Sequence, residues 1–231
     1  LTEQGITILN NVTLESVSND GDKPVITANN QNYTFDAVLY ATGRKANTAN
    51  IGLEHTDIAT NERGAIVVND TCESSVPGVY AVGDVNGGPQ FTYVSLDDFR
   101  IVFGTLTGNS QYTLKDRKNI PYTTFLTPPL SRVGLTEEDA INQGYTVKTK
   151  EILVATMPRA HVNDYLKGAF KIVVDANNDL ILGATLYSQG AEELINLIKM
   201  AMDNNIPYTY FKNQIFTHPT MAENLNDLCN F

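Results

Sequence analysis

The sequence predicts an α/β portion followed by an α+β domain with an antiparallel sheet and flanking helices. Two continuous apolar runs, at 37–41 and 78–82, each end in a glycine turn, which is typical of strands buried on both faces of a sheet. Residues 122–202 instead alternate strand and helix patterns and contain an Asn-Asn hairpin signal. The polar stretch at 108–121 predicts the boundary between the two portions.

The first portion contains mostly strand patterns. A hairpin is expected at 25–35, where two β-rich runs flank an Asn-Asn pair. A helix is expected from Thr92 to about Leu106, because apolar residues recur through it and Gly104 and Gly108 mark its end. The other strands are expected at 5–9, 12–17, 37–41 and 78–82.

The second portion alternates strands and helices. A helix with acidic residues in its first turn is expected to begin near Thr136 and to be closed by Gly144. The most convincing amphipathic helix pattern lies at 191–202. Strands are expected at 122–126, 147–155, 169–174 and 180–186, the last two joined as a hairpin.

The composition narrows the classes of partner. The chain has 231 residues, a formal net charge of -10 and a pI of about 4.7. This acidity argues against binding to nucleic acid or to an anionic membrane surface, and no apolar run is long enough to span a bilayer. No leader pattern is visible, so a cytoplasmic, reducing setting is expected. The missing initiator Met suggests that the chain begins inside a longer polypeptide.

The cysteines and histidines predict neither a disulfide nor a metal site. Cys72 and Cys229 are too far apart for a CxxC-type motif, and the three histidines form no cluster. Cys72 has no basic neighbour that would lower its pKa. Cys229, third from the end, is expected to be a mobile, exposed thiol.

Three candidate binding elements follow strands in the predicted fold. Asp84 comes where the run 78–82 opens into a glycine loop, and its carboxylate could accept a hydrogen bond from a sugar-type hydroxyl, with Gly83 permitting close approach. A simple turn is the alternative. The turn 42–44 could bring Gly43 close to a ligand and Arg44 to a phosphate, or Arg44 could be solvated.

The start of the helix after Asp84 offers free backbone N–H groups and a partial positive charge. An anionic or electron-rich ligand edge would be favoured at residues 91–93. The alternative is that Thr92 is only an N-cap, since every helix has such a start.

Near the C-terminus, His218 directly precedes Pro219, and Glu223 follows five residues after the histidine. Pro219 restricts the backbone and makes a cis bond possible. Glu223 could hold the imidazole in one tautomer, which is the arrangement of a general acid/base. A surface His-Pro turn is the alternative.

Four strings in order carry a resemblance: ATGR at 41–44, GVYAVGDV at 78–85, FLTPP with VGLTE within 125–137, and HPTMAE at 218–223. They resemble the C-terminal half of the pyridine nucleotide–disulfide oxidoreductases, the flavoproteins that include glutathione reductase, dihydrolipoamide dehydrogenase and mercuric reductase. The residues around His218 look more like mercuric-reductase-like bacterial flavoproteins that handle reactive chlorine species or hypothiocyanous acid. The tail has one cysteine, where mercuric reductases have a vicinal pair.

The resemblance implies a partial FAD/NAD-binding domain followed by a dimerisation domain. Residues 1–40 would end the NAD(P)-binding domain, 41–114 would be the returning segment of the FAD-binding domain, and 115–231 would be the dimerisation domain that makes a homodimer. The implied cofactors of the parent enzyme are FAD and NAD(P)H, with FAD expected to bind weakly or not at all to this chain alone, and the implied substrate is a small oxidised molecule. The physiological substrate and the choice between NADH and NADPH stay open.

The resemblance also implies residue roles. Asp84 would bind the ribityl chain of FAD. His218 would serve the partner subunit's active site as acid/base beside a redox cysteine pair, Glu223 would orient it, and the His218-Pro219 bond would be cis. The implied cofactor-binding residues are Gly43, Gly83, Asp84, Phe91, Thr92 and Tyr93.

The chain lacks a G-x-G-x-x-G fingerprint and the Cys-x4-Cys redox pair of that family. Two hypotheses follow: a C-terminal fragment of an FAD-dependent NAD(P)H oxidoreductase, which alone would be inactive, or a non-enzymatic dimerisation module. Asp84 and His218 favour the first, because a pure interface module needs neither. Residues 1–110 are expected to expose apolar surface without a packing partner.

Overall fold

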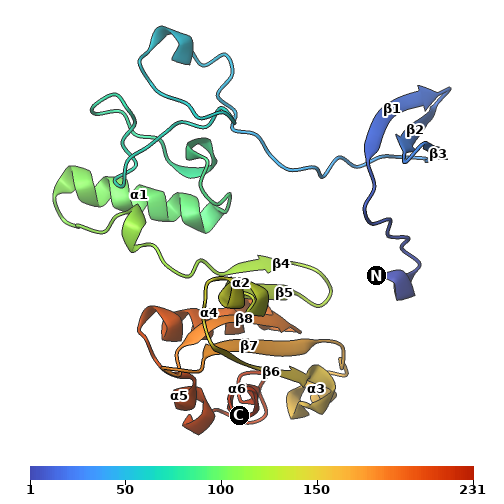
Figure 1. Ribbon diagram of the computed structural model, residues 1–231, viewed down its shortest axis with the longest axis vertical. Helices are drawn as coiled ribbons and strands as arrows, with labels where there is room; N and C mark the ends of the chain where they lie inside the picture. Colours follow the sequence, from blue (N-terminus) through green and yellow to red (C-terminus); the bar gives the residue numbers. More distant parts are fainter.

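The computed structural model describes residues 1–231. It contains two separate sheets, one of three strands near the N-terminus and one of five strands in the C-terminal part (Figure 1). Its strands are β1 (Leu14–Asp20), β2 (Lys23–Ala28), β3 (Gln31–Thr34), β4 (Tyr122–Thr124), β5 (Leu130–Gly134), β6 (Val147–Leu153), β7 (Ala169–Asp175) and β8 (Ile181–Tyr187). Its α-helices are α1 (Thr92–Thr107), α2 (Glu137–Asn142), α3 (Pro158–Val162), α4 (Ala191–Asp203), α5 (Tyr208–Asn213) and α6 (Asn224–Leu228). Short 3-10 turns are η1 (Thr2–Gln4), η2 (Leu53–His55), η3 (Gly83–Asn86), η4 (Leu114–Asp116) and η5 (Val154–Thr156).

The C-terminal part is an antiparallel sheet of five strands in the order β4-β5-β8-β7-β6, flanked by helices (Figure 1). Helix α4 packs against β8 and β5, and α6 packs against β6 and β7. A core cluster of 19 buried residues lies entirely between Val133 and Cys229. Burial of this apolar surface is the main stabilising contribution to the domain, and the predicted α+β fold with an antiparallel sheet is confirmed.

In the C-terminal part, the turn, helix and capping patterns of the sequence correctly predicted several elements. The β7–β8 hairpin and helix α4 are confirmed within one or two residues of the expected ranges. Thr136 caps α2, because its hydroxyl accepts the Asp139 N–H at 2.9 Å while the Asp139 carboxylate accepts the Thr136 N–H at 3.2 Å. The helix ends at Asn142, and Gly144 follows in a left-handed conformation with φ 88°.

The N-terminal part holds a separate three-stranded antiparallel sheet in the order β1-β2-β3 (Figure 1). The predicted hairpin around Asn29 and Asn30 is confirmed, and both residues have positive φ, which asparagine tolerates in tight turns. Helix α1 is also confirmed. It ends at Gly108, whose φ of 68° places it in the left-handed region typical of a helix C-terminus.

The predictions of strands at 5–9, 37–41 and 78–82 were wrong. None of these segments pairs within either sheet, and only an isolated bridge joins Tyr80 to Glu73. Leu39 is 90% exposed, so the run 37–41 is not buried. A strand buried on both faces needs hydrogen-bonded neighbours on both sides. The run 78–82 has only residues 72–74 beside it, on one side, and the other two segments have no such neighbour. Most of the large apolar side chains of these segments are therefore exposed, as expected for residues 1–110, although Ala81 is buried.

The prediction that Cys229 is a mobile, exposed thiol was also wrong. Cys229 is fully buried in the core beside Leu225 and Leu228 of α6. Burial raises the pKa of its thiol to about 12, an effect that Lys150 only partly offsets. Cys229 is buried although it lies near the end of the chain, because α6 packs against the sheet.

None of the helices combines the length and the apolar character that crossing a membrane requires.

Candidate functional site

A cleft of about 1620 Å³ lies between the start of α1, the segment before β4 and one side of helix α4. Its lining includes the predicted residues Gly83, Asp84, Phe91, Thr92 and Tyr93. Gly43 does not line the cleft, and no atom would lie within 4 Å of a Cβ added there. The structure therefore brings together five of the six residues predicted to bind a cofactor.

Asp84 lies in η3 and lines the cleft with an exposed carboxylate. The nearest opposite charge is Arg44, whose Nη1 is 3.6 Å from Asp84 Oδ2. Both side chains are more than half exposed, so this pair contributes little to stability. The Asp84 carboxylate is consequently available to accept hydrogen bonds from a ligand hydroxyl.

The first turn of α1 presents free donors to the same cleft. Phe91, with an extended backbone, is the N-cap residue, and no side chain caps the helix. The N–H groups of Val94 and Ser95 donate to the Phe91 carbonyl, whereas those of Thr92 and Tyr93 have no acceptor. Thr92 is therefore not the N-cap that the alternative interpretation required. Two unsatisfied donors and the helix dipole favour an electronegative ligand edge here.

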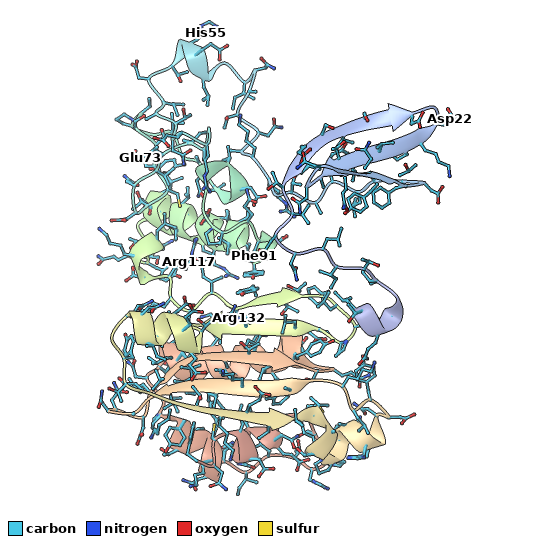
Figure 2. All side chains as sticks on the ribbon, turned by 45° about the vertical axis from the view of Figure 1, so that its right-hand side comes forward. Asp22, His55, Glu73, Phe91, Arg117 and Arg132 are labelled. Atoms are coloured by element: carbon cyan, nitrogen blue, oxygen red, sulfur yellow. The ribbon has the colours of Figure 1, made fainter.

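The side chains around these amides form an aromatic stack. The Phe91 ring stacks on Tyr93 at 5.1 Å between centroids and on Tyr122 of β4 at 6.2 Å. The Tyr93 hydroxyl donates to the Pro121 carbonyl at 2.6 Å, and burial raises the pKa of Tyr93. Figure 2 shows Phe91 between α1 and the five-stranded sheet, where Arg132 is 5.9 Å from the Tyr122 ring centroid. The backbone of this turn, rather than its rings, thus offers the free polar groups.

Gly83 is required by packing within the chain. Its φ is 74°, and a Cβ there would lie 2.7 Å from the Ser95 hydroxyl oxygen on α1. The missing side chain lets η3 lie directly against α1. The close neighbour at this glycine is Ser95 of the same chain, and the approach of a ligand to Gly83 stays a prediction.

Sequence reasoning missed Asp98, whose buried carboxylate holds the η3 turn beside the cleft. Asp98 is fully buried, and its Oδ2 accepts the Gly83 N–H at 2.7 Å and the Asn86 side-chain amide at 2.8 Å. Arg117 donates to its other oxygen and, through Nε, to Asp97 at 2.7 Å. Burial alone would lower the pKa of Arg117, but hydrogen bonds and charge from Asp98 and Asp97 raise it overall. Adjacent aspartates inside an otherwise apolar helix were the available signal.

His218 and Glu223 form the predicted pair. His218 Nδ1 lies 2.7 Å from Glu223 Oε2, and because a carboxylate only accepts, Nδ1 carries the hydrogen. The hydrogen bond from His218 lowers the pKa of Glu223, and burial partly opposes that shift. The imidazole is 68% exposed and its Nε2 has no partner, whereas Glu223 is 19% exposed. Nε2 is therefore free to take up a proton from outside the chain.

A hydrogen-bonded turn holds this pair in place. The second Glu223 oxygen accepts the Thr220 N–H at 3.1 Å, and the Thr220 hydroxyl donates to the Thr217 carbonyl at 2.8 Å. The His218-Pro219 bond is cis, as predicted. Asn224, which sequence reasoning missed, is buried and donates to the carbonyls of Thr220 and Met221. The His218–Glu223 pair is thus fixed to the start of α6.

The pair and the cleft are separate within one chain. Neither His218 nor Glu223 lines the cleft that contains Asp84. Neither cysteine lines the cleft. Cys72 is buried, and desolvation with the charge of Asp98 raises the pKa of its thiol to about 11. Such a thiol is a poor nucleophile.

Comparison with known proteins assigns a family. Residues 1–98 match the family model described as pyridine nucleotide-disulphide oxidoreductase, and residues 120–229 match the dimerisation domain of the same family. The chain belongs to the pyridine nucleotide–disulphide oxidoreductase family.

Among relatives, the chain is 44% identical over 228 residues to the probable pyridine nucleotide-disulfide oxidoreductase RclA of Escherichia coli K12, covering 99% of this chain and 52% of that protein. It is 34% identical to a mercuric reductase of Staphylococcus aureus over 97% of this chain and 42% of that one. The solved structure of the HOCl-induced flavoprotein disulfide reductase RclA from Escherichia coli superposes with a TM-score of 0.94 at 43% identity, over 99% of this chain and 52% of that chain. The chain thus spans about half the length of the relatives it matches.

Proposed function

We propose that this chain provides the dimer interface, part of the FAD site and the acid/base pair of an FAD-dependent NAD(P)H oxidoreductase that acts as a homodimer on a small oxidised substrate. A redox cysteine pair from outside this chain would exchange electrons with that substrate. The observation that carries the proposal is the meeting of the Asp84 carboxylate with the unpaired amides of Thr92 and Tyr93 in one cleft.

The donor set fits FAD. The Asp84 carboxylate suits a ribityl hydroxyl, and the amides of Thr92 and Tyr93 suit the electronegative pyrimidine edge of a flavin. Bound FAD would supply the hydride and electron chemistry that no side chain of this protein provides. The chain's own contribution would be to bind and orient the cofactor and to place positive partial charge at one end of it.

His218 would hold and release a proton at Nε2, while Glu223 keeps Nδ1 protonated. The exposure of the imidazole and its absence from the Asp84 cleft support action in trans. In a homodimer formed through residues 115–231, His218 of one subunit would serve thiols in the other subunit. The domain division proposed for this role is 1–40, 41–114 and 115–231.

The test is a titration of the purified chain with FAD, in which binding is measured by the quenching of flavin fluorescence. Asp84→Ala should weaken binding by about tenfold, because a charge-assisted hydrogen bond is lost. Glu193→Ala is the matched control, since Glu193 also lines the cleft but has no assigned ligand contact. Equal affinities for wild type and both variants would refute the Asp84 role.

The purified chain alone should not oxidise NADH or NADPH with any disulfide or hypohalous substrate, because its two cysteines are buried and distant in sequence. Light scattering on the same sample should give the mass of a dimer. Turnover by this chain alone would overturn the requirement for an external cysteine pair.

A non-enzymatic dimerisation module is the second candidate, favoured by one observation. The 19-residue core cluster lies wholly between Val133 and Cys229, so the C-terminal domain carries most of the buried apolar packing. A chain that forms dimers, together with a full-length parent protein that binds no FAD, would support this candidate over the first.

A further inference from the structure

A buried ion pair connects the segment before the C-terminal domain to the turn that carries Asp84. We propose that Arg117 is a positioning residue that fixes η3, and with it Asp84, through the buried carboxylate of Asp98. What Asp84 binds rests on the proposed function, but the positioning itself is a property of this chain. Figure 2 shows Arg117 between α1 and the five-stranded sheet.

Asp98 is the connecting element, because a single carboxylate serves both sides. Its Oδ2 holds two donors of η3, the Gly83 N–H at 2.7 Å and the Asn86 side chain at 2.8 Å. Its Oδ1 accepts from Arg117 Nη2. The Asp98 side chain is 1% exposed, so this anion depends on its protein donors rather than on water.

The η3 turn is held from a second side by Ser95. The space that a Gly83 side chain would fill is occupied by the Ser95 hydroxyl, so the turn cannot move closer to α1. Asn86 extends the arrangement, because its side-chain oxygen accepts the Gly88 N–H at 3.0 Å. Asp84 lies between Gly83 and Asn86, so its backbone position follows from these contacts.

Arg117 belongs to the segment 113–121, which is held by contacts near both of its ends. The Leu114 N–H donates to the Asp70 carbonyl at 2.8 Å, and Lys115 forms an ion pair with the Asp70 carboxylate. At its other end, the Pro121 carbonyl accepts the Tyr93 hydroxyl, and β4 begins one residue later. Residues 113–121 therefore act as a strap between the two parts of the chain.

The strap has a consequence for the cleft. Arg117 uses two nitrogens on two carboxylates, Nε on Asp97 and Nη2 on Asp98, which fixes the direction of the Asp98 side chain. Without Arg117, Asp98 is a buried anion with neutral donors alone, and recruiting water would break its hold on Gly83. The orientation of β4 relative to α1 is thereby linked to the position of Asp84.

Hydrogen exchange by mass spectrometry on the full 231-residue chain tests the proposal. Arg117→Met should speed exchange in the peptide covering 82–88 by about tenfold or more, because a charge-assisted hydrogen bond no longer orients Asp98. Arg117→Lys should restore part of the protection, since it returns one charge but cannot reach both aspartates. Arg100→Met is the matched control: Arg100 lines the same cleft without a bond to η3.

Exchange in the β7–β8 hairpin should stay at wild-type values in all three variants. Equal acceleration in that hairpin and in 82–88 would show global destabilisation and would overturn a positioning role, as would unchanged exchange in 82–88. A parallel FAD titration separates the two proposals. If no form binds FAD, this chain alone does not hold the cofactor, while the exchange result still decides the role of Arg117. If FAD binds, Arg117→Met should weaken the affinity for FAD, and Arg100→Met should leave that affinity unchanged.

Discussion

Glu223 sets the tautomer of His218, and Glu223→Gln should reverse it. In the wild type, the neutral imidazole carries its hydrogen on Nδ1, since it donates to the Glu223 carboxylate over 2.7 Å. The variant keeps the shape of the side chain and can still accept the Thr220 N–H through its amide oxygen. Its NH2 group can donate to Nδ1, which requires the hydrogen of His218 to move to Nε2.

The magnitude follows from the strength and exposure of this hydrogen bond. A hydrogen bond to a charged group is worth about 1.5–3 kcal/mol when buried, and solvent screening reduces it for an imidazole that is 68% exposed. About 1 kcal/mol remains, which corresponds to a change of about fivefold in the tautomer ratio. The free lone pair on Nε2, which a general base needs, is lost to the same extent.

Nitrogen chemical shifts of the imidazoles measure the ratio directly, at a pH of about 9 where histidine is neutral. His161 provides an internal reference, because its Nε2 lies 2.8 Å from the Ala155 carbonyl and must carry the hydrogen there. The wild type should thus show opposite tautomers at His218 and His161, and only His218 should change in the variant. The same ratio at His218 in both proteins would refute the orienting role of Glu223.

Three further outcomes are expected. Phe170→Ala should lower the free energy of unfolding in urea by about 3–5 kcal/mol, because Phe170 is fully buried, whereas Phe125→Ala at an exposed position should cost less than about 0.5 kcal/mol. Neither cysteine should react with a thiol reagent at a pH of about 8 until urea is added, since burial raises the pKa of Cys72 to about 11 and of Cys229 to about 12; rapid native-state labelling would contradict this. The hydrogen bond from His218 lowers the pKa of Glu223 below its ordinary value of 4.5, so its stabilisation is present above that value and is lost as the pH falls through the folded-state pKa. Acid unfolding curves should therefore converge for wild type and Glu223→Gln below this window, and a constant separation would contradict the linkage.

Short-range signals explain what the sequence could predict. The β7–β8 hairpin needs only its turn and two β-rich runs, and α4 needs only its apolar stripe, so both were found within one or two residues. The His218–Glu223 contact spans five residues around a proline and is equally local. Propensity and spacing suffice where the partner of a residue lies close by in the chain.

Long-range pairing explains the failures. The apolar runs 37–41 and 78–82 have the composition of buried strands, but a strand is defined by its neighbours, and none of the eight strands in the chain pairs with them. Arg117 and Asp98 are 19 residues apart, and nothing in either local sequence announces their contact. Cys229 was missed for the same reason, because its burial depends on α6 docking against β6 and β7.

The two halves of the candidate site are held by different physical means. His218 and Glu223 are anchored through Asn224 and Leu225 to a packed core, so their geometry resists change for as long as the C-terminal domain is folded. Asp84 lies outside that core and is held by directional bonds through Asp98 and Arg117. Removing one donor from a buried anion is strongly destabilising, because it leaves part of the buried charge without a partner. The Asp84 half should therefore respond first to changes at the boundary between the two parts, while the histidine half stays intact.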